Sequence, residues 1–77
     1  MIDDDAPLAL LELRGEDAYS RMYDTHGNTA AAACYSEAKD FFTDAIARAR
    51  TLGRTADVER LQARLAHIKA VFRSQFS

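Results

Sequence analysis

The chain has one cysteine, one proline, three glycines and no tryptophan. A lone Cys34 cannot form a disulfide within the chain, so we expect a fold without covalent cross-links and a reducing, cytoplasmic setting. The glycines at positions 15, 27 and 53 are far apart. No glycine-rich phosphate-binding loop is therefore present, and nucleotide binding has no support.

Long apolar runs are also missing. The longest, Ala30 to Tyr35, is mostly alanine and is far shorter than the roughly 20 residues that a membrane span requires. The chain begins with Asp3, Asp4 and Asp5, where a secretory signal would carry basic residues before an apolar stretch. We therefore expect neither export nor a membrane partner.

Positive charge is not in excess, since the net charge is −2 and the pI is about 5.5. The charge is divided, however, with −7 over residues 1–47 and +5 over residues 48–77. In a compact helical fold, such a division predicts acidic and basic helices lying side by side. A nucleic-acid-associated regulator is the alternative, with phosphates bound by the basic flank of the third helix, Arg60, Arg64, Lys69 and Arg73.

Residues for chemistry are sparse. His26, His67 and Cys34 share no metal-ligand spacing, so we expect neither a metal nor another cofactor. A Cys34 nucleophile would need His67 as its base, but Cys34 falls on an apolar helical face, where packing is the simpler role. We expect no catalytic residue and no enzymatic activity.

What the sequence does contain is apolar residues at helical spacing. This periodicity predicts helices over residues 7–24, 29–52 and 55–76. Pro7 suits the first turn of the first helix, whereas Gly15 is a point where that helix could break. Gly27 and Gly53 mark the two breaks between helices, with Asn28 or Thr29 expected to cap the second helix and Thr55 the third.

The predicted fold class is therefore all-α, either a three-helix antiparallel bundle or a helical hairpin plus one helix. Residues 1–6 form a flexible acidic tail in this prediction, and residues 7–77 form a single helical domain. The chain is so short that its own core is small, and a second copy could enlarge it.

The third predicted helix carries an apolar seam with steps of three and four residues, which is typical of helix pairing. It consists of Val58, Leu61, Leu65, Ile68 and Phe72, and Phe76 extends it. We expect this seam to be the interface with a partner. The cations beside the seam should meet acidic groups of the first or second helix, for which Glu37, Asp40 and Asp44 are candidates.

The segment from Tyr35 to Ile46 resembles the second helix of a tetratricopeptide repeat. Tyr35, Ala38, Phe42 and Ala45 occupy the aromatic and small positions of that pattern. The segment from Leu52 to Leu65 would then resemble the first helix of a following repeat, in an array of about one and a half units. Residues Thr29 to Cys34 depart from the pattern, because they continue the helix where the family has a tight turn. The resemblance implies protein or peptide binding and transfers no binding residue; generic helix packing explains the same spacing.

Together these features predict a small non-catalytic module that binds a protein partner or self-associates, most simply as a homodimer, through the seam of the third helix.

Overall fold

The computed structural model describes residues 5–24 and 27–75, which form three helices and, over these ranges, no strand. Helix α1 spans Asp5–Asp24, α2 spans Asn28–Thr51 and α3 spans Thr55–Gln75. The predicted all-α, three-helix fold is confirmed. Residues 1–4 of the predicted tail, His26 and Phe76 lie outside the described residues.

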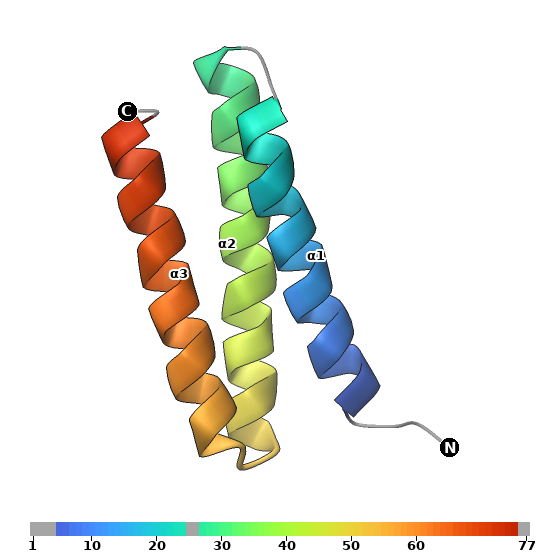
Figure 1. The fold of residues 1–77 in the computed structure, drawn as a ribbon. Helices are drawn as coiled ribbons and strands as arrows, with labels where there is room; N and C mark the ends of the chain where they lie inside the picture. Colours follow the sequence, from blue (N-terminus) through green and yellow to red (C-terminus); the bar gives the residue numbers. More distant parts are fainter. Residues whose placement is uncertain (1–4, 25–26, 76–77) are drawn as a thin grey trace.

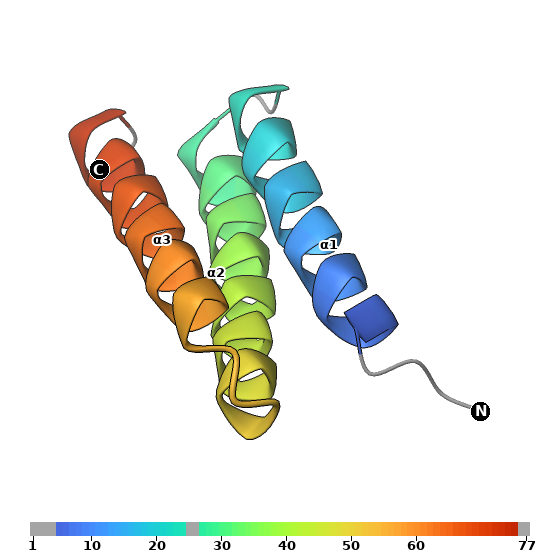
Figure 2. The same cartoon turned by 60° about the horizontal axis from the view of Figure 1, so that its bottom comes forward.

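Helix α2 lies between the other two helices in both views of the fold (Figure 1 and Figure 2). It packs extensively against α1 and less extensively against α3, whereas the backbones of α1 and α3 hardly approach each other. The Cα atoms span 42 × 23 × 13 Å. The arrangement is therefore a helical hairpin with a third helix beside it, the second of the two predicted architectures.

The core forms because each helix presents one apolar face. On α1 this face is Leu8, Leu11, Gly15, Ala18 and Met22, at steps of three and four residues. One cluster of buried side chains joins all three helices and includes Leu8, Phe42, Ile46, Leu61 and Ile68. Fully buried alanines of α2, among them Ala45 and Ala49, let the neighbouring helices approach closely.

Helix α1 is continuous through Gly15, so this glycine does not break it. Gly15 is buried against the ring of Phe42 in α2. A Cβ atom at position 15 would lie only 2.8 Å from Cδ2 and Cε2 of that ring. Glycine at position 15 thus allows α1 and α2 to pack closely, although glycine lowers the helix propensity of α1.

The turn between α2 and α3 is built as predicted around Gly53, which has a φ of +72°. The Arg54 N–H donates to the Ala49 carbonyl at 2.9 Å and the Gly53 N–H donates to the Arg50 carbonyl at 3.1 Å. This pair of bonds is a Schellman motif, which satisfies carbonyls at the end of a helix.

The predicted caps differ from the structure. Helix α2 is preceded by Gly27, with a φ of +95° and no side-chain cap, and Asn28 is already helical. Thr55 is the first residue of α3, and the Val58 N–H donates to the Arg54 carbonyl, so Arg54 takes the cap position. The residues expected to cap these helices therefore lie inside the first turn of α2 and of α3 and not before it.

Candidate functional site

The seam of α3 lies largely inside the chain's own core. Leu61 and Ile68 are fully buried and Leu65 is 8% exposed, while Val58 packs partly buried against the same cluster. Phe72 stacks on Tyr35 of α2 with ring centroids 4.1 Å apart. An interface made through these residues would require α3 to leave α2, so the role of the seam as an interface stays a prediction.

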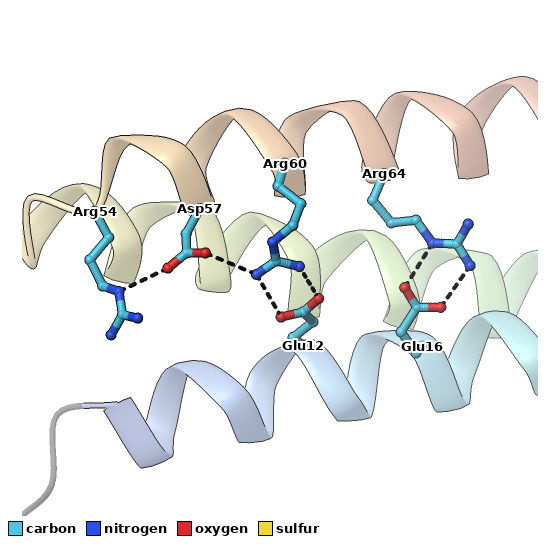
Figure 3. Close-up of polar contacts among 6 residues, drawn as sticks. All are labelled: Glu12, Glu16, Arg54, Asp57, Arg60 and Arg64. Atoms are coloured by element: carbon cyan, nitrogen blue, oxygen red, sulfur yellow. Dashed lines mark hydrogen bonds and ion pairs between the residues drawn. The ribbon is translucent and has the colours of Figure 1, made fainter.

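Two arginines of the basic flank of α3, Arg60 and Arg64, form ion pairs with carboxylates of α1. Arg64 forms a two-pronged ion pair with Glu16 of α1, with Nε to Oε2 at 2.7 Å and Nη2 to Oε1 at 2.8 Å. Arg60 likewise binds Glu12 of α1 through both of its terminal nitrogens (Figure 3). The acidic and basic helices thus lie close enough to pair, as the charge division predicts.

A third acid, Asp57, extends this network along α3. Asp57 accepts a hydrogen bond from Arg60 at 3.2 Å and another from Arg54 at 2.8 Å (Figure 3). The hydrogen bond from Arg60, followed by the charge of Arg54, lowers the pKa of Asp57 below its ordinary value. The hydrogen bonds that Arg60 donates to Glu12 and Asp57 raise the pKa of Arg60, so both Arg60 and Asp57 stay charged at neutral pH.

We call the two pairs Glu12–Arg60 and Glu16–Arg64 the carboxylate clamp. It joins α1 to α3 across the face of α2, where the backbones of the two outer helices hardly approach each other. Arg64 also lies over the ring of Tyr19, with Cζ 5.0 Å from the centroid, and His67 meets the same ring edge-on at 6.5 Å. These side chains bridge α1 and α3 on this face, which keeps a smaller pocket of about 170 Å³ beside Glu12 and Arg60.

Sequence reasoning missed Glu12 and Glu16 as the partners of α3. The expected acids behave differently: Glu37 binds Arg21 of α1 at 2.7 Å, and within the described residues Asp40 and Asp44 form no ion pair. A signal was present, because the two glutamates are four residues apart and so are Arg60 and Arg64. Two helices that run in the same direction bring such spacings into register.

The clamp should contribute modestly to stability. The side chains of Arg64 and Glu16 are 37% and 36% exposed, so solvent screens their attraction. A double-mutant cycle with Arg64→Ala and Glu16→Ala should give a coupling of about 0.2–1 kcal/mol, and the coupling should shrink in high salt. Chemical denaturation of the four proteins measures it. A coupling that does not respond to salt would contradict an electrostatic clamp.

Tyr19 provides a titration that reports on the same face. Burial, together with its hydrogen bond to Tyr23, raises the pKa of Tyr19 to about 12 from an ordinary value of 10.0. Because the folded state holds this proton more tightly, the associated stability is complete below pH 10 and is lost as the pH rises toward 12. We expect an ultraviolet phenolate titration to show a late-ionising group that disappears in Tyr19→Phe. An unchanged late phase in that variant would assign the group to another tyrosine.

A groove lies on the other side of α3, between α2 and α3, with a volume of about 390 Å³ and no contribution from α1. On α3, helical periodicity places its lining residues and the clamp arginines on opposite sides of the buried seam. Ile46 and Leu65 form the apolar floor, each 8% exposed, whereas the core residues Phe42, Leu61 and Ile68 have no exposed surface.

The walls of the groove are small or polar. Ala47 and Ala66 leave it open, Thr43 and Gln62 add uncharged polar groups, and Arg50 and Lys69 are its charged residues. No acidic residue is among the described residues that line it. Within the described residues neither Arg50 nor Lys69 has a carboxylate partner, in contrast to Arg54, Arg60 and Arg64.

Residues considered for chemistry are not gathered at this groove. Cys34 is half-buried on α2, His67 is exposed on α3, and in the described part of the chain no hydrogen bond joins them. Across residues 5–24 and 27–75, no group of three or more His, Cys, Asp or Glu side chains is placed to hold a metal ion. No described helix is long and apolar enough to cross a membrane.

Comparisons with known proteins return no matching family model, no matching curated protein and no matching solved structure. No family match therefore supports the resemblance of residues 35–46 to a tetratricopeptide repeat. The structure supports the coarser statement that the fold is all-helical.

Proposed function

We propose that this chain is a small non-catalytic protein–protein interaction module whose partner binds in the groove between α2 and α3. The observation that carries this proposal is the groove itself, an apolar floor of Ile46 and Leu65 that α1 leaves uncovered. Pockets of a few hundred Å³ with apolar linings and a few polar groups are typical of ligand sites, and an apolar groove between helices can receive a segment of a partner protein.

The surrounding structure supports a fixed surface at this place. The floor residues belong to the core cluster that joins all three helices, so the groove is preformed on a packed scaffold. A preformed site loses little conformational entropy when a partner binds. The stack of Tyr35 on Phe72 also holds α3 against α2 at the end of this helix pair that is distant from the turn at Gly53.

Binding of a nucleic acid, or of a second copy through the α3 seam, would require changes to the structure. A phosphate backbone would have to displace Glu12 and Glu16 from Arg60 and Arg64 before it could use them. A homodimer through the α3 seam would have to expose Leu61 and Ile68, which are buried in the single chain. The tetratricopeptide likeness and a cytoplasmic location are compatible with the interaction module and add no residue to it.

A site-specific photo-cross-linker tests the proposal. Placed at Ala66, an exposed residue of the groove, it should give a discrete adduct with a partner protein in the native cells. Ser20, exposed on α1, is the matched control position and should give no such adduct. The proposal fails if position 66 gives no adduct or if both positions give the same set of adducts.

A further inference from the structure

We infer that the occupant of the groove is an acidic amphipathic helix, with apolar anchors on one face and carboxylates near both ends of the bound segment. This inference rests on the proposed function and adds the chemistry of the partner. Three observations carry it: the charge left unpaired around the groove, the position of that charge, and the shape of the groove.

The first observation is charge. Arg50 and Lys69 line the groove, and no carboxylate within the described residues pairs with either. Lys39 of α2 holds its Nζ 5.6 Å above the ring of Tyr35, and in the described part of the chain it too forms no ion pair. Although the whole chain is acidic, with a net charge of −2, both charged residues that line the groove are cations, and they match a partner segment of opposite sign.

The second observation is where these cations lie. Helices α2 and α3 are antiparallel (Figure 1), and the Tyr35–Phe72 stack sets their register. In that register Arg50 is level with Asp57, whereas Lys69 and Lys39 are level with each other. The backbones of the two cationic ends are therefore about 18 Å apart along the helix axes, or roughly three turns of a helix.

The third observation is shape. The groove is bounded by two helices and has no strand edge in the described structure, so a partner cannot add a strand to a sheet here. An amphipathic helix can lay side chains at i, i+3 or i+4, and i+7 onto an apolar floor such as Ile46 and Leu65. Ala47 and Ala66 are small enough to let its backbone approach.

Selection from a displayed library of helices about four turns long, randomised on their surface positions, tests this inference. We expect the selected helices to carry Leu, Ile or Phe anchors between Asp or Glu residues. Reversing both charges with Arg50→Glu and Lys69→Glu should weaken their binding about tenfold. Arg14→Glu, an exposed cation on α1, is the matched control and should leave it unchanged.

The other outcomes separate this inference from the proposed function. The selected helices could instead be neutral or basic, bind the charge-reversed protein equally well, and fail to bind the variant Ala66→Trp, whose new side chain fills the groove. The groove would then be a binding site, and the assignment of an acidic partner would be overturned. If no helix is selected, both fail. If the purified chain self-associates and the charge reversals disperse it, the occupant is a second copy and the inference is likewise overturned.

Discussion

Phe42→Ala is expected to lower the free energy of unfolding by about 3–5 kcal/mol. Phe42 has no exposed surface and belongs to the cluster that contains residues of all three helices. Removing its ring would leave a cavity in the core that α1, α2 and α3 share. Since small domains are stable by only about 5–15 kcal/mol, this one change should bring the chain close to unfolding.

Phe41→Ala is the matched control for that experiment. It deletes the same atoms from the preceding residue of α2. Phe41 is only half-buried and lies outside the core cluster. Urea denaturation followed by circular dichroism should show a much smaller loss for Phe41→Ala than for Phe42→Ala. Equal losses would mean that the core is not arranged around Phe42.

Gly15→Ala should destabilise the protein, although glycine to alanine normally stabilises a helix by about 1 kcal/mol. The new methyl group would stand 2.8 Å from two ring carbons of Phe42, which has no room to move because it is fully buried. Overpacking of this kind typically costs about 1–3 kcal/mol. The packing cost should therefore exceed the gain in helix propensity.

A second substitution tests the cause of this loss. In the background Phe42→Leu, which shortens the opposing side chain, Gly15→Ala should be less harmful or should even stabilise the protein. Ser20→Ala, exposed on the same helix, controls for propensity and should be neutral or slightly stabilising. A stabilising Gly15→Ala in the wild-type background would contradict the close contact between α1 and α2.

Periodicity predicts the three helices well because each one buries a single face. The predicted ranges 7–24, 29–52 and 55–76 compare with observed helices of Asp5–Asp24, Asn28–Thr51 and Thr55–Gln75. The ends are less predictable, because the cap positions of α2 and α3 are taken by Gly27 and Arg54 and not by the polar residues that follow them. Gly15 shows a further limit. Its low helix propensity suggests a break in α1, and the reason for a glycine at this position becomes visible only from its contact with the ring of Phe42.

The arrangement of α3 could not be read from its apolar seam alone. A stripe such as Leu61, Leu65 and Ile68 is equally suited to the chain's own α2 or to another protein, so it predicts burial without naming the partner. The groove depends on how far α3 rotates about α2, which exposes Ile46 and Leu65 on one side and brings Arg60 and Arg64 to Glu12 and Glu16 on the other. That rotation is decided by packing between helices distant in sequence.

Light scattering over a concentration series, with and without a selected acidic helix, tests most directly the claim that the groove is free to receive a partner. We predict a mass of 8.6 kDa for the chain alone at every concentration, and an increase by one partner mass when the helix is added. A chain that doubles its mass by itself, and returns to a monomer in Arg50→Glu with Lys69→Glu, would contradict the claim, because its own second copy would then cover the groove.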